Sequence, residues 1–85
     1  MEIRYRNRFA KEYKKLSPIV KNAAKKKEII FRKNPFDSRL KTHKLSGPLD
    51  GFLAFSISQK YRIIFAFDEK DIVEFYSIGN HDIYD

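Results

Sequence analysis

The C-terminal part of the chain constrains the fold most, because three short segments there alternate apolar and polar residues and are joined by very short links. Residues 52–58, 61–67 and 72–78 each show the period of two that is typical of a half-buried β-strand. The links are Gln59-Lys60 and the four residues 68–71. Links of this length join neighbouring strands as hairpins, so the sequence predicts an antiparallel meander.

The N-terminal part begins with a short alternating segment and then changes to a helical period. Residues 2–5 alternate polar and apolar side chains, which predicts a strand. Phe9, Tyr13 and Leu16 then recur at the spacing of one helix face, and Asn7 is the predicted N-cap of that helix.

A second helix is predicted over residues 18–33. Ser17 can cap it, and Pro18 suits its first turn because proline lacks the N–H that this turn leaves unpaired. Asn34-Pro35 ends the helix, because the residue before a proline disfavours helical geometry. The positions expected to face the core are Ile19, Val20, Ala23, Ala24, Ile30 and Phe31. The tight connection between the two helices predicts an antiparallel hairpin.

The predicted meander has a heavily aromatic face, which is expected to pack on the helices, and a lighter face, which is expected to be open. The lighter face carries Ala54, Ser56, Arg62 and Ala66. Period two places Arg62 there, because it points away from Tyr61 and Ile63. An arginine in mid-strand loses hydration unless an anion meets it, so either a neighbouring carboxylate or a bound phosphate is expected.

Charge is unevenly spread along the chain, whose net charge is +7. Residues 1–44 hold fifteen Lys or Arg against four Asp or Glu, whereas residues 45–85 hold three against seven. A basic half indicates a polyanionic partner, either nucleic acid or an acidic protein. Lysine-rich helix faces that are simply solvated would produce the same asymmetry.

The composition argues against several classes of protein. The chain has no cysteine, so disulfides and thiolate metal sites are not expected, and two histidines are too few for an expected structural zinc site. No apolar run approaches the ~20 residues of a membrane span, and residues 1–4 do not resemble a signal peptide. Eighty-five residues predict a single domain, and the cytoplasm is the expected compartment.

Two histidines and a tyrosine are candidates for chemistry. The first is His43, in a predicted loop over residues 35–51 whose other basic side chains are Arg39, Lys41 and Lys44. The second is His81, which follows the last predicted strand after Gly79. A histidine can give or take protons near neutral pH, although a lone loop or tail histidine is often inert. Tyr84 can stack on a base or contact a phosphate, or it can close the edge of the core.

These groups together suggest RNA cleavage that needs no metal or cofactor. In such a reaction a base deprotonates a ribose 2′-OH, which attacks the adjacent phosphorus while an acid protonates the leaving 5′ oxygen. A cation stabilises the charge that develops on the phosphorane. His43 as base, Arg62 as phosphate clamp and His81 as acid would fill these three roles.

The chain resembles the RelE/ParE superfamily of toxin–antitoxin toxins, in particular the RelE-like and YafQ-like mRNA interferases. The segments that carry the resemblance are the predicted opening strand, residues 9–16, His43-x-Leu45-x-Gly47, Tyr61-Arg62-Ile63-Ile64-Phe65 and Ile78-Gly79-Asn80-His81-Asp82-Ile83-Tyr84. The resemblance implies a single RelE-like domain over residues 1–85. Its implied α+β fold has the order β-α-α-β-β-β, with a helix hairpin on one face of a mainly antiparallel four-stranded sheet.

The resemblance also implies an activity, partners and roles for particular residues. It implies cleavage of mRNA on the ribosome and inhibition by an antitoxin that folds around the toxin. By position, Arg62 matches the arginine that contacts the scissile phosphate, His81 the acid and His43 a catalytic histidine. Tyr84 matches a C-terminal aromatic residue of the family. The expected RNA-binding residues are Arg39, Lys41, Lys44 and Lys60.

Two departures from the family pattern keep other functions open. Arg39 stands near the place of a glutamate base in some relatives, and Ala54, Ser56 and Ser58 stand where others carry basic or histidine side chains. The alternatives are a ParE-like protein that binds DNA gyrase and a non-catalytic basic module that binds RNA or an antitoxin. The two histidines and Tyr84 favour the nuclease, because a gyrase binder needs none of them.

Overall fold

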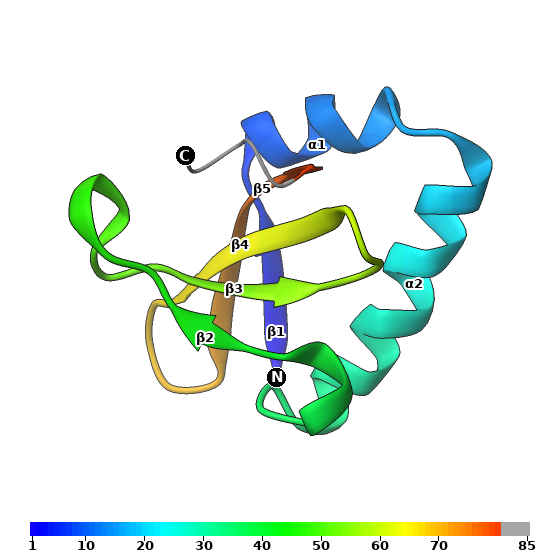
Figure 1. Ribbon diagram of the computed structural model, residues 1–85. Coiled ribbons are helices and arrows are strands. Elements are labelled where there is room, and N and C mark those ends of the chain that lie inside the picture. Colours follow the sequence, from blue (N-terminus) through cyan, green and yellow to red (C-terminus); the bar gives the residue numbers. More distant parts are fainter. Residues whose placement is uncertain (81–85) are drawn as a thin grey trace.

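The computed structural model describes residues 1–80, which form two helices and a five-stranded sheet (Figure 1). The helices are α1 (Asn7–Lys14) and α2 (Pro18–Lys33). The strands are β1 (Glu2–Tyr5), β2 (His43–Lys44), β3 (Leu53–Ser56), β4 (Tyr61–Phe67) and β5 (Ile72–Asn80). Their order in the sheet is β1-β5-β4-β3-β2; β1 runs parallel to β5, and the other neighbours are antiparallel. No helix within the described residues is long and apolar enough to cross a membrane.

The predicted α+β class is confirmed, and the sheet has one strand more than predicted. The additional strand is β2, which pairs His43 with Ala54 inside the segment that was predicted to be loop. Two 3₁₀ turns, η1 (Ser38–Leu40) and η2 (Gly47–Leu49), flank it. A two-residue strand is too short to show alternation, so its pattern could not reveal it.

The strands of the meander lie where they were predicted, with two changes at their ends. β3 is shorter than predicted, and β5 runs past Gly79 to Asn80. Gly79 does not end the strand, because it lies within the β4–β5 ladder opposite Arg62. The ladder is irregular between Ile64 and Phe65, where the register of β5 shifts by one residue.

The bounds of α2 agree with the prediction, whereas the start of α1 does not. The Ser17 hydroxyl accepts a hydrogen bond from the Val20 N–H, and Asn34 ends the helix. The N-cap of α1 is Arg6 and not Asn7. Arg6 keeps extended geometry because its N–H donates to the Phe75 carbonyl, continuing the pairing of β1 with β5.

The two helices do not form the predicted antiparallel hairpin. In Figure 1, α1 runs across the top of the view, whereas α2 descends along its right-hand side. Each helix follows its own contact with the sheet: Phe9 of α1 packs 5.5 Å from the Phe75 ring, and Phe31 of α2 packs 4.8 Å from the Phe55 ring. A short linker therefore did not set the angle between the helices.

The core lies between the helices and the aromatic face of the sheet, as predicted. Phe31 is fully buried, and its ring contacts the rings of Phe55, Phe65 and Phe75 on three adjacent strands. The prediction that Ile19 faces the core is wrong, because this residue is 82% exposed. The buried stripe of α2 contains Ala24 and Phe31, and Ile19 lies about a third of a turn away from it.

The lighter face is open only in part. Ala54, Ile64 and Ser77, which lie opposite one another on β3, β4 and β5, are fully buried. The ring of Phe52 lies 5.0 Å from that of Tyr76. Phe52 directly precedes β3 and Tyr76 lies on β5, and β4 lies between these two strands, so the contact spans β4 and covers the middle of this face. The prediction of an uncovered face is therefore wrong at its centre.

Glu12 of α1 closes the edge of β5 beyond the last residue that pairs with β1. Its Oε1 accepts hydrogen bonds from the Ser77 hydroxyl at 2.7 Å and from the Ile78 N–H at 3.1 Å. Ser77 is fully buried, so Glu12 supplies an acceptor that water could not.

We expect Glu12→Ala to lower the free energy of unfolding by about 1–3 kcal/mol, because two donors near the core would lose their acceptor. Urea denaturation measures this change. Glu12→Gln is the matched control, since its amide oxygen can still accept, and it should lose less. Equal stability of Glu12→Ala and the parent would contradict this role.

Candidate functional site

A basic pocket lies at the edge of β3, beyond the point where β2 stops. β2 pairs only with Leu53 and Ala54, so this strand leaves the rest of the β3 edge uncovered. The residues that line the hollow, of about 350 Å³, are Lys27, Arg39, Lys41, Ser56, Ser58, Gln59 and Arg62. We call this set the basic pocket. It joins α2, the η1 segment and the β3–β4 hairpin.

Arg62 is anchored in the pocket by neutral groups. Its Nη1 donates to the carbonyl oxygens of Ser58 at 3.1 Å, Gln59 at 3.3 Å and Tyr61 at 3.2 Å. Within residues 1–80 it forms no ion pair with a carboxylate. Its positive charge is therefore uncompensated there, and the Nε and Nη2 side of the guanidinium can meet an anion.

Arg39 is anchored by a carboxylate instead. Asp37 Oδ1 accepts from the backbone N–H and the Nε of Arg39, both at 2.9 Å, and Asp37 Oδ2 accepts from Nη2 at 2.9 Å. The side-chain hydrogen bonds from Arg39, followed by its backbone N–H, lower the pKa of Asp37 from 3.8 to about 2. The ion pair fixes the orientation of the Arg39 guanidinium in the pocket, and its two charges cancel.

Lys27 is a pocket residue that was not among the predicted site residues. Its Nζ donates to the Arg39 carbonyl oxygen at 3.3 Å. Lys27 lies one helical turn before the buried Phe31, so both side chains leave α2 on the same side. That i, i+4 relation is the sequence signal that could have identified it.

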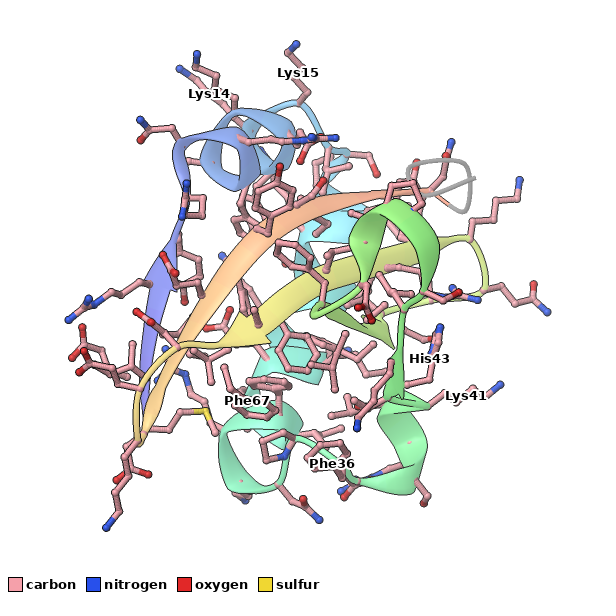
Figure 2. All side chains as sticks on the ribbon, turned by 90° about the vertical axis from the view of Figure 1, so that its left-hand side faces the viewer. Lys14, Lys15, Phe36, Lys41, His43 and Phe67 are labelled. Carbon is pink, nitrogen blue, oxygen red and sulfur yellow. The ribbon has the colours of Figure 1, made fainter. Side chains whose placement is uncertain are left out.

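Lys41 and His43 extend the site along the chain toward β2 (Figure 2). Lys41 lines the basic pocket and has a left-handed backbone with φ of 53°, a conformation that is uncommon for residues other than glycine. His43 is exposed and lines a separate hollow with Leu45 and Leu49. Its Nδ1 lies 3.1 Å from the Lys41 carbonyl oxygen, which can only accept, so Nδ1 carries a proton and neutral His43 presents Nε2 as a base.

The chain is similar to known proteins in structure and not in sequence. No protein-family model and no curated protein matches the sequence. YafQ from Escherichia coli strain BL21(DE3) superposes with a TM-score of 0.74 at 20% identity, covering 94% of this chain and 92% of YafQ. The YoeB/ParE toxin from Agrobacterium tumefaciens gives a TM-score of 0.80 at 14% identity, with coverage of 95% and 99%. The chain has the RelE/ParE toxin fold.

A third similar structure contains a partner. It is YafQ in the E. coli DinJ–YafQ toxin–antitoxin complex, with a TM-score of 0.66 at 20% identity, covering 94% of this chain and 91% of that one. The resemblance that the sequence motifs indicated is thus confirmed at the level of the RelE/ParE fold.

Two further predicted site residues, Lys44 and Lys60, lie outside the basic pocket. Lys44 pairs with Leu53, one residue out of phase with His43, and so faces away from it. Lys60 lies in the β3–β4 hairpin and lines a shallow hollow with residues of α2, outside the basic pocket. His81 and Tyr84 lie outside the described residues.

The Asp37–Arg39 pair predicts an acidic titration that depends on Arg39. In the folded protein the Asp37 carboxyl should titrate near pH 2, and in Arg39→Gln its pKa should rise toward 3.8. Because the pKa is lower in the folded state, the pair stabilises the fold above about pH 4, and this contribution is lost as the pH falls toward 2. Carboxyl carbon NMR shifts measure it. An Asp37 midpoint near 4 in the parent would contradict the ion pair.

Proposed function

We propose that this protein is a toxin of a type II toxin–antitoxin system that cleaves mRNA on the ribosome. The observation that supports this most is Arg62, which lines the basic pocket of a RelE/ParE fold and forms no ion pair with a carboxylate within residues 1–80. Cations there can bind a phosphodiester and stabilise the charge of its transition state. The cytoplasm, where translated mRNA lies, is the proposed site of action.

The strand register supports a shared substrate for His43 and Arg62. His43 lies opposite Ala54, and Arg62 lies opposite Ser56, so both side chains leave the same face of the sheet. Their backbones are separated by about 7 Å along the strands and about 10 Å across them. An RNA segment that lies across this face can contact both side chains, with Arg62 lining the basic pocket and His43 lining a separate hollow.

The proposed reaction uses His43 Nε2 to take the proton of a ribose 2′-OH. The 2′ oxygen bonds to phosphorus, the bond from phosphorus to the 5′ oxygen breaks, and Arg62 stabilises the added negative charge. We propose His81 as the acid that protonates the 5′ oxygen and Tyr84 as an aromatic contact to the RNA. The products are a 2′,3′-cyclic phosphate and a 5′-hydroxyl.

RNA binding outside the reacting phosphate is assigned to the basic side chains around the pocket. Arg39 and Lys41 belong to the pocket itself, whereas Lys44 and Lys60 are exposed side chains outside it. Fifteen of the eighteen Lys and Arg residues lie within residues 1–44, which supports the attraction of a polyanion such as ribosomal RNA.

Arg62→Ala should abolish growth inhibition and reduce mRNA cleavage by about 10²–10³-fold, because the transition state would lose its phosphate clamp. Primer extension on a translated message after induction measures the cleavage. Thermal unfolding should show a retained fold, since Arg62 is half-buried and outside the core.

Arg4→Ala is the matched control, because Arg4 is an exposed arginine on β1 at the opposite edge of the sheet. It should cleave as the parent does. Growth arrest by the parent with intact translated mRNA would exclude the nuclease, and trapped, cleaved DNA would favour a gyrase inhibitor instead.

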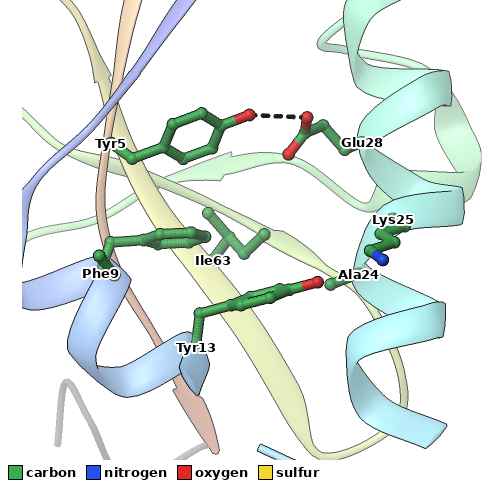
Figure 3. A pocket seen from close by; sticks show the side chains of 8 residues that line it. Tyr5, Phe9, Tyr13, Ala24, Lys25, Glu28 and Ile63 are labelled. Atoms are coloured by element: carbon green, nitrogen blue, oxygen red, sulfur yellow. Dashed lines mark hydrogen bonds between the residues drawn. The ribbon is translucent and has the colours of Figure 1, made fainter. Parts of the chain in front are cut away.

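The partner part of the proposal is an antitoxin, and an apolar groove between α1 and α2 supports it (Figure 3). The groove has a volume of about 410 Å³ and is lined by Tyr5, Phe9, Ala10, Tyr13, Ala24, Lys25, Glu28 and Ile63. Tyr5 donates to Glu28 at 2.8 Å across one end of it. Burial, and then the hydrogen bond to Glu28, raises the pKa of Tyr5 and keeps this donor protonated.

The charges beside the groove indicate an acidic occupant. Lys25 lies on the rim, and the Lys21 ammonium lies 5.8 Å from the centre of the Tyr13 ring. Glu28, the acidic lining residue, is already paired with Arg32 at 3.4 Å. An amphipathic antitoxin segment with an apolar face and acidic flanks would match this surface.

Ala10→Glu should weaken binding of an acidic amphipathic peptide, because it adds bulk and negative charge to the groove. The probe is a synthetic helical peptide with leucine on one face and glutamate on the other, and fluorescence anisotropy measures its affinity. We expect a loss of about tenfold or more. Asn22→Glu, on the exposed side of α2, is the control. Equal binding of a lysine version of the peptide would contradict an acidic partner.

A further inference from the structure

Arg39 is held at three points, of which two are on its backbone and one is its exposed side chain. Its backbone N–H and its guanidinium both donate to Asp37, and its carbonyl oxygen accepts from Lys27. Asp37 itself is the N-cap of η1, and its N–H donates to the Asn34 carbonyl oxygen at the end of α2. The guanidinium is thus tied to α2 through short, defined contacts.

The two arginines of the basic pocket differ in what anchors them. Arg62 is anchored by carbonyl oxygens, and no carboxylate within residues 1–80 pairs with its charge, whereas Arg39 is anchored by a carboxylate that cancels its charge. A guanidinium has five N–H donors. Asp37 engages the Nε–H and one Nη2 donor, so the remaining donors of Arg39 can face a ligand in the pocket that it lines.

We propose that Asp37 is a positioning residue, which orients Arg39 to hydrogen-bond the RNA while removing its contribution to the attraction of RNA. This inference rests on the proposed endoribonuclease function. The positive charges of Lys27, Lys41 and Arg62 attract the RNA, and the oriented guanidinium of Arg39 positions it. The oriented guanidinium holds the scissile phosphate in line with the attacking 2′ oxygen. A small misplacement of the phosphate would strongly lower the rate of cleavage.

Asp37→Asn separates orientation from attraction. The substitution adds one positive charge to the pocket and removes the ion pair that holds Arg39. Binding to a single-stranded RNA oligonucleotide should tighten, and its logarithmic salt dependence should steepen by about 0.7 per added contact. Cleavage at saturating programmed ribosomes should nevertheless fall by about tenfold to a hundredfold. A merely structural role for Asp37 would not move binding and turnover in opposite directions.

The double variant Asp37→Asn, Arg39→Gln keeps the net charge of the pocket and removes only the oriented fork. Its salt dependence of RNA binding should equal that of the parent, and its turnover should fall as in Arg39→Gln alone. Circular dichroism and thermal unfolding establish that each variant is folded. Turnover of the double variant at the parent rate would overturn the proposal.

A second result would also overturn the positioning role of Asp37, namely a rise of both turnover and RNA affinity in Asp37→Asn. The charge of the pocket alone would then explain its effect on cleavage. The parent and Arg62→Ala identify failure of the underlying function. If the parent does not cleave mRNA on ribosomes, the nuclease and this inference are both wrong. If the parent cleaves and Asp37→Asn cleaves equally well, only this inference is wrong.

Discussion

The packing of Phe31 against three strands is the interaction on which the rest of the structure depends. Its ring lies within 5.3 Å of the rings of Phe55, Phe65 and Phe75, and it has no exposed surface. This contact holds α2 against one face of the sheet and so commits that face to the core. Because side chains alternate along β4, the same contact directs Arg62 to the other face. Lys27, one turn before Phe31, is carried to the edge of β3.

The basic pocket combines cations that are anchored in two different ways. Carbonyl oxygens orient Arg62 without reducing its charge, whereas the Asp37 carboxylate orients Arg39 and cancels its charge. A site made only of free lysines would attract RNA but would not define the position of a phosphate, because an ammonium is a flexible point charge. The pocket therefore has the two properties that the proposed phosphodiester site requires, namely positive charge and oriented hydrogen-bond donors.

Features that depend on neighbouring residues in the chain could be predicted. The bounds of α2 follow from Ser17 and Asn34-Pro35, because caps and prolines act locally. The face of Arg62 follows from the period of two along one strand. The predictions failed where a distant segment competes, as when pairing with β5 keeps Arg6 extended and makes it, rather than Asn7, the N-cap of α1. The partial cover of the lighter face also comes from a distant contact, that of Phe52 with Tyr76.

The sequence by itself determined the α+β class, the meander, the bounds of α2 and the side of the sheet that Arg62 occupies. All of these follow from periodicity and from local backbone chemistry. Only the tertiary structure decided that Lys27, Arg39 and Lys41 meet Arg62 in one pocket, and that a groove lies open between α1 and α2. The physical reason is that these groups come from segments far apart in the chain. Core packing around Phe31 brings these segments together, and the sequence pattern of a single segment cannot predict that packing.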